Sequence, residues 1–115
     1  MKIIILTANE ERHKFFRRYL NNHKNINVSL AICEDNKERQ YFKVLNSKKS
    51  TKLQKLHFKN RIKSEKIFFS SFNKSHKDPT NTLFVKRGDI NKKKNILKKI
   101  IKQRSNLIIS YGCGL

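Results

Sequence analysis

The chain has 115 residues, with 28 lysine and arginine residues against 8 acidic ones and a formal net charge of +20. That length favours one domain, and aliphatic and phenylalanine residues are too frequent for a disordered chain. No apolar run approaches the ~20 residues that cross a bilayer, and the opening apolar segment is too short for a signal peptide, so we expect a cytoplasmic protein without membrane association.

The first 33 residues predict a strand, a helix and a second strand. Residues 2–7 hold four consecutive aliphatic side chains, which is typical of a buried strand. Asn9 is predicted to cap a helix that has carboxylates at residues 10–11 and ends at residues 21–22. Apolar side chains alternate along residues 26–33, as in a second strand. This order favours a parallel βαβ unit with a right-handed crossover.

The middle of the chain predicts two helices, at residues 38–45 and 53–72, with an interruption at 47–51. Four apolar side chains of the second helix share one stripe, which Glu65 interrupts; they are Phe58, Ile62, Phe69 and Phe72.

The last third predicts a turn at residues 78–81, a short strand at 82–85, and a lysine-rich helix capped by Asn91. That helix is expected to end near Arg104 and to bury four apolar side chains: Ile96, Leu97, Ile100 and Ile101. Residues 106–111 predict a final strand with a buried centre at 107–109.

Together these elements predict an α/β fold, a Rossmann-like, open, mostly parallel sheet with flanking helices. The first strand is expected between the second and the last. Cys33 and Cys113 then lie two strands apart, about 10 Å, which is too far for a disulfide. Because the chain ends four residues after a strand predicted to be buried, we expect residues 1–115 to be the N-terminal part of a larger domain. The open sheet edge favours self-association.

The positive charge has two interpretations. Residues 39–64 hold nine basic residues and no acid, which fits either a solvated face or a nucleic-acid contact. Lysine outnumbers arginine 21 to 7, whereas base readout favours arginine. Weak, non-specific polyanion binding is expected, and a small basic RNA- or DNA-binding module is the alternative function.

Several segments resemble the formyltransferase-like proteins, a group related to methionyl-tRNA formyltransferase and the sugar N-formyltransferases. Residues 7–10 read Thr-Ala-Asn-Glu after an apolar strand, and a helix with Arg12, His13 and two aromatic residues follows. Further similar segments come in family order, at residues 62–69, 86–91 and 106–113. Ala8 stands where the family more often has glycine, and Asn106 where it has aspartate.

The resemblance implies transfer of a formyl group from 10-formyltetrahydrofolate to an amine on a sugar nucleotide or an aminoacyl-tRNA. The family's catalytic Asn, His and Asp follow the Tyr-Gly strand, and no residue of this chain matches them. The resemblance therefore implies a fold truncated before the catalytic segment, inactive alone, with no catalytic and no metal-binding residue assigned here.

Two groups of binding residues are predicted where strands end, because ligands of open parallel sheets sit at that edge. Thr7, Asn9, Arg12 and His13 are candidates for substrate binding, with helix capping as the alternative for residues 7–10. The resemblance places Tyr111, Gly112 and Cys113 beside the folate crevice, where glycine would let the backbone approach a flat pterin.

Overall fold

A computed structural model of the chain describes residues 1–35 and 45–113. Its strands form one sheet in the order β3-β2-β1-β4, and every neighbouring pair is parallel. The strands are β1 (Lys2–Thr7), β2 (Asn27–Asp35), β3 (Thr82–Lys86) and β4 (Leu107–Tyr111). The helices are α1 (Glu11–Asn21), α3 (Lys52–Ser75), α4 (Asp89–Lys92) and α5 (Lys94–Lys102). The α/β class, the open parallel sheet and the order second-first-last are confirmed.

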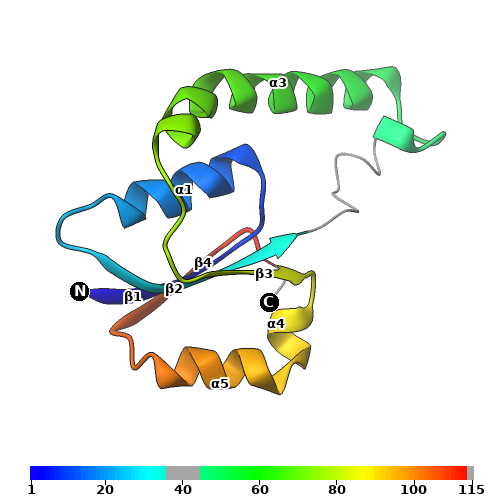
Figure 1. The fold of residues 1–115 in the computed structure, drawn as a ribbon. Coiled ribbons are helices and arrows are strands. Elements are labelled where there is room, and N and C mark those ends of the chain that lie inside the picture. Colours follow the sequence, from blue (N-terminus) through cyan, green and yellow to red (C-terminus); the bar gives the residue numbers. More distant parts are fainter. Residues whose placement is uncertain (36–44, 114–115) are drawn as a thin grey trace.

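The helices form layers on both faces of the sheet (Figure 1). Helix α1 covers one face, and α4 and α5 cover the other. Helix α3 lies on the outer side of α1, where the Phe15 ring contacts the rings of Phe69 and Phe72 with centroids 4.8 and 4.9 Å apart. The molecule therefore has three layers, which are α1, the sheet, and α4 with α5, and α3 forms a fourth outside α1.

Strand β1 is the centre of the core because a strand flanks it on each side. Ile4 and Leu6 pack toward Ile96 of α5, whereas Ile3 and Ile5 pack toward Phe16 of α1. The two faces of a strand alternate with period two, so a run of four aliphatic residues supplies both halves of the core.

The apolar side chains of β2 do not all lie on one face of the sheet, although their alternation in the sequence predicts that they do. Its register against β1 shifts between Ile3 and Ile4, which pair with Val28 and Leu30. The Ser29 hydroxyl donates to the Ile3 carbonyl oxygen at 3.2 Å at this bulge. As a result Val28 packs on the α1 side while Leu30 packs on the α5 side.

Helix α1 begins after Glu10, so the prediction of Asn9 as its cap is wrong. The Glu10 N–H donates to Nδ1 of His13 at 3.1 Å, which satisfies a backbone donor at the helix start. The Asn9 side chain instead accepts a hydrogen bond from Arg17. The predicted end of the helix at residues 21–22 is confirmed.

Helix α3 begins one residue before the predicted start because Thr51 caps it. The Thr51 hydroxyl oxygen accepts from the Gln54 N–H at 3.1 Å, and Gln54 accepts from the Thr51 N–H at 3.0 Å. The predicted stripe is half-buried along its length. Glu65 interrupts it because its carboxylate pairs with Arg12 of α1 at 2.6 Å. The helix predicted at 38–45 lies outside the described residues except at Leu45.

The lysine-rich helix predicted from Asn91 to Arg104 is two helices. Lys93 has extended backbone angles and separates α4 from α5, and Asn91 lies inside α4. Ile96 is buried and Ile100 packs beside it, but Leu97 and Ile101 are exposed. The prediction for these last two is wrong because Leu97 and Ile101 lie about 100° around the helix from Ile96 and Ile100, away from the face that meets the sheet.

Strand β4 lies at the edge of the sheet, so its centre is not buried as predicted. Leu107 is 47% exposed and Ile108 is 50% exposed, while Ile109 packs against the α1 side of the core. Among the described residues, β4 pairs only with β1. Its outer side is a row of backbone donors and acceptors next to apolar side chains, an arrangement that favours strand pairing between chains.

We expect the chain to self-associate through β4 as salt rises above about 0.1 M, because screening removes the repulsion between highly charged copies. Ile108→Lys should keep the chain monomeric, because a charged edge side chain opposes strand pairing. Leu53→Lys adds the same charge on α3 and should associate like the unchanged chain. Light scattering across a salt series measures this, and a chain that stays monomeric throughout would contradict it.

Candidate functional site

The carboxyl ends of β1, β2 and β4 meet at one edge of the sheet, as predicted. Thr7 is in register with Cys33 on one side and with Tyr111 on the other. The turn after β1, the end of β2 and the turn after β4 are therefore adjacent. This edge is where open parallel sheets bind ligands.

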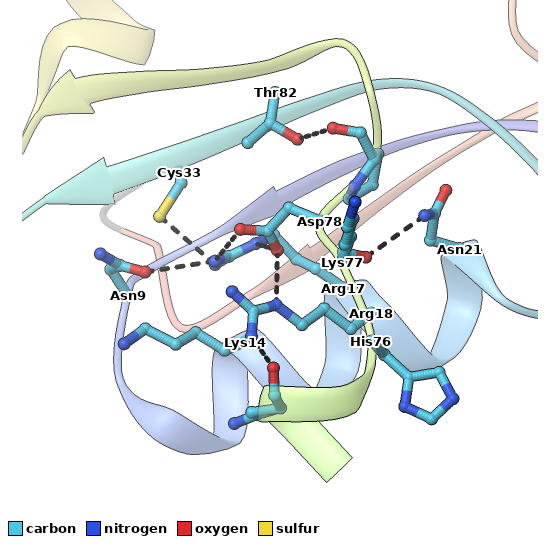
Figure 2. A network of polar contacts seen from close by, with 12 residues as sticks. Asn9, Lys14, Arg17, Arg18, Asn21, Cys33, His76, Lys77, Asp78 and Thr82 are labelled. Atoms are coloured by element: carbon cyan, nitrogen blue, oxygen red, sulfur yellow. Dashed lines mark hydrogen bonds and ion pairs between the residues drawn. The ribbon is translucent and has the colours of Figure 1, made fainter. Parts of the chain in front are cut away.

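Arg17 occupies the centre of this edge and is completely buried (Figure 2). Its Nη1 donates to the Thr7 hydroxyl oxygen at 2.9 Å, the Ala8 carbonyl oxygen at 3.0 Å and the Cys33 sulfur at 3.3 Å. Its Nη2 donates to the Asn9 side-chain oxygen at 3.2 Å. One guanidinium therefore joins the end of β1, the turn after it and the end of β2. A buried charge of this kind is tolerated only with full hydrogen bonding and a counter-charge.

The counter-charge is Asp78, in the connection between α3 and β3. Its two carboxylate oxygens lie 3.1 Å from Arg17 Nε and 3.4 Å from Arg17 Nη2, and Arg18 Nε donates to it at 3.3 Å. Burial opposes the ionisation of Asp78, but the hydrogen bonds and charges of Arg17 and Arg18 outweigh burial and lower its pKa. Asn21 also donates to the Lys77 carbonyl oxygen, so α1 holds this connection at several points.

We expect Asp78→Asn to lower the free energy of unfolding by about 3 kcal/mol, because it leaves Arg17 buried without its counter-charge. Asp35→Asn makes the same change of charge at an exposed position and should have little effect. Denaturant unfolding at pH 7 measures both.

The pH dependence gives a second measurement of the Asp78 interaction. A lowered pKa means that the contribution of Asp78 is present above the ordinary carboxyl value of 3.8 and disappears as pH falls through its folded-state pKa. The stability difference between the unchanged chain and Asp78→Asn should therefore shrink in acid below that value. A difference that stays constant down to strong acid would show that Asp78 acts without its charge.

His13 lies against the turn that follows β4. Its ring meets the Tyr111 ring edge to face, with centroids 4.9 Å apart, and it is almost completely buried. Gly112 has φ +73°, and a Cβ there would lie 2.2 Å from His13 Nε2. The space that glycine leaves open at this turn is thus filled by His13. Phe16 also contacts the Tyr111 ring, at 5.2 Å.

Gly112→Ala should destabilise the chain more than Gly88→Ala. Both positions have positive φ, which costs an alanine about 1–2 kcal/mol. Only at Gly112 must a buried ring also move, which adds about 1–3 kcal/mol, whereas a Cβ at Gly88 meets nothing closer than 3.9 Å. Thermal unfolding of the two variants compares them, and equal losses would mean that His13 moves without cost.

The two cysteines are free thiols with β1 between their strand ends. Burial raises the pKa of the Cys33 thiol, and its Sγ donates to the Ala8 carbonyl oxygen at 3.3 Å. Burial and the nearby Glu34 carboxylate raise the pKa of the Cys113 thiol. A raised pKa keeps both as thiols at neutral pH, so neither has the character of a nucleophile.

The predicted substrate-binding residues do not form one surface. Thr7 and Asn9 both accept hydrogen bonds from Arg17, a role that the sequence did not predict for them. Arg12 pairs with Glu10 at 2.8 Å and with Glu65 of α3 at 2.6 Å. His13 contacts the predicted folate segment at Tyr111 and Gly112 through its ring, and Thr7 pairs with Tyr111 through the backbone of the sheet.

Three residues of this edge were missed by sequence reasoning: Arg17, Asp78 and Glu34. Glu34 is buried at the end of β2 and accepts a hydrogen bond from the Gly88 N–H at 2.8 Å. A signal for Arg17 exists, because it lies four residues after His13 and on the same face of α1 as Leu20. No local pattern identifies Asp78 as its partner, 61 residues away.

A second feature is a hollow of about 500 Å³ between α1 and α3. Its lining includes four cationic side chains, Lys14, Arg18, Lys66 and Lys74. Asn73 forms its inner wall and is only 5% exposed. The Asn73 amide donates to both the carbonyl and the carboxylate oxygen of Glu11 at 3.0 Å, which fixes the hollow between the two helices.

Comparison of the chain with protein-family models found no match, and comparison with curated proteins and with solved structures found none either. In the part of the chain that the structure describes, no helix is both long and apolar enough to span a membrane. Within residues 1–35 and 45–113, no three His, Cys, Asp or Glu side chains come together as a metal site.

Proposed function

We propose that this chain is the N-terminal part of a formyltransferase-like domain in the cytoplasm, and that it contributes binding surface for the formyl donor and the amine acceptor. The observation that carries this proposal is the contact between two of the segments that carry the resemblance. The helix after the Thr-Ala-Asn-Glu turn meets the Tyr-Gly turn directly, through His13, Tyr111 and Gly112.

The parallel sheet supports the same proposal. The segments at residues 7–10 and 111–113 are far apart in sequence, but the register of Thr7 with Tyr111 puts them side by side at the carboxyl edge. A ligand at this edge would touch both at once, which fits a donor and an acceptor that must meet.

The residues present fit 10-formyltetrahydrofolate in part. The Tyr111 ring is 39% exposed and offers a flat apolar surface for a pterin. The sequence predicts that Gly112 lets the backbone approach a pterin closely. In the structure, His13 already occupies the space that a Cβ at Gly112 would fill. We propose that Gly112 acts by fixing the turn, and that the backbone of residues 111–113 supplies the hydrogen bonds.

Formyl transfer needs a donor for the developing oxyanion and a base for the amine proton. The buried Arg17 and Asp78 neutralise one another and hold the edge together, and His13 Nδ1 accepts from its own helix start. We therefore assign no catalytic residue within residues 1–35 and 45–113. The acceptor class stays open between a sugar nucleotide and an aminoacyl-tRNA.

Amide NMR during titration with 5-formyltetrahydrofolate, a stable relative of the donor, tests this proposal. We expect chemical-shift changes at residues 7–13 and 111–113, and their loss in Gly112→Ala but not in Gly88→Ala. The chain alone should transfer no formyl group from 10-formyltetrahydrofolate to an amine. Shift changes confined to α3 or α5, or none at millimolar ligand, would contradict the proposal.

A further inference from the structure

The lysines of α3 lie on one face of the helix. At about 100° per residue, six of them fall within an arc of roughly 100°, with Ser70 in the gap before the last. We call these residues the lysine stripe: Lys52, Lys55, Lys59, Lys63, Lys66 and Lys74. From first to last they span 22 residues, or about 33 Å along the helix axis.

The packing of α3 on α1 leaves this stripe free of contact with the core. Phe69 and Phe72 contact Phe15 of α1, and Phe58 and Ile62 are half-buried on the same stripe of the helix. Five of the six stripe lysines are exposed, and Lys55 is partly so. Helix α3 has one acidic residue, Glu65, and it pairs with Arg12 and Arg61. Within residues 1–35 and 45–113, no carboxylate forms an ion pair with a lysine of the stripe.

At its C-terminal end the stripe reaches the hollow between α1 and α3. Lys66 and Lys74 border the hollow from α3, and Lys14 and Arg18 border it from α1. Lys14 forms an ion pair with Glu11 at 3.4 Å, and Arg18 forms one with Asp78 at 3.3 Å. Lys66 and Lys74 therefore carry most of the uncompensated positive charge at the hollow. The positive surface therefore runs along α3 and ends in a concave site.

We propose that the lysine stripe and the hollow form a docking surface for the phosphate backbone of a nucleic-acid duplex. A duplex carries one negative charge per about 1.7 Å of its axis, so a straight row of cations about 33 Å long meets many phosphates at once. The row contains no arginine, and lysine acts on phosphate as a point charge and not as a reader of base edges. The binding is therefore independent of sequence.

Two other partners fit this surface less well. Single strands bind by stacking bases on aromatic rings, but Phe69 and Phe72 pack on Phe15 of α1. Phe58 is half-buried, and the exposed Phe68 lies about 200° around the helix from Lys66. A membrane-surface helix needs a continuous apolar face, whereas polar residues separate the exposed apolar side chains of α3. These polar residues are Asn60, Ser64 and Ser71.

Fluorescence anisotropy with a labelled DNA duplex of mixed sequence, between about 50 and about 200 mM salt, tests the proposal. The decisive variant replaces Lys59, Lys63 and Lys66 by glutamine. The control replaces Lys98, Lys99 and Lys102 of α5, three exposed lysines on the opposite face of the sheet, and so has the same net charge. We expect the stripe variant to lower the slope of log affinity against log salt by about 2.7, and the control to leave it unchanged.

The single replacements Lys59→Gln and Lys63→Gln should each lower the slope of log affinity against log salt by about 0.9. They take the place of the triple variant in this measurement if the triple variant unfolds. Equal effects of the stripe and control variants would overturn the proposal, because binding would then follow net charge alone. Binding to anionic lipid vesicles without binding to the duplex would overturn it as well. The outcome of this duplex-binding experiment does not depend on whether the chain binds 5-formyltetrahydrofolate.

Discussion

The buried ion pair between Arg17 and Asp78 is the interaction on which the arrangement of this molecule depends. Arg17 lies on α1, its hydrogen bonds reach the ends of β1 and β2, and Asp78 belongs to the connection between α3 and β3. One residue pair thus links the first βαβ unit to the helix that packs outside it. Removing a buried charge from water is costly, so the pair holds only in this one geometry and the geometry is correspondingly well defined.

This pair also determines what the carboxyl edge of the sheet can do. Thr7, Asn9 and Cys33 each accept a hydrogen bond from Arg17, so these side chains help to hold the edge together. The surface left for a ligand lies further along, where Tyr111 is partly exposed beside His13. A rigid hydrogen-bonded network next to a binding surface holds the groups of that surface in position.

The charge of the chain is organised more strongly than its composition suggests. A lysine-rich composition alone would spread charge over every surface, yet α3 aligns its six lysines on one side. Its one acid, Glu65, pairs with Arg12 of α1 and with Arg61 of α3. Helix α3 holds this alignment because its aromatic side packs on α1, through Phe15 and its partners. Charge and packing therefore occupy different faces of the same helix.

The sequence by itself determined the local elements: the four strands, the presence of α1 and α3, and the α/β class, because each follows from the pattern of its own apolar residues. The predicted ends were less exact, since α3 continues to Ser75, three residues past its predicted end. Only the tertiary structure decided which residues share a face. The bulge at Ser29 moved half of β2 to the other side, and the edge position of β4 exposed Leu107 and Ile108. It also joined Arg17 to Asp78 and His13 to Gly112, contacts that depend on packing between segments and leave no period in the sequence.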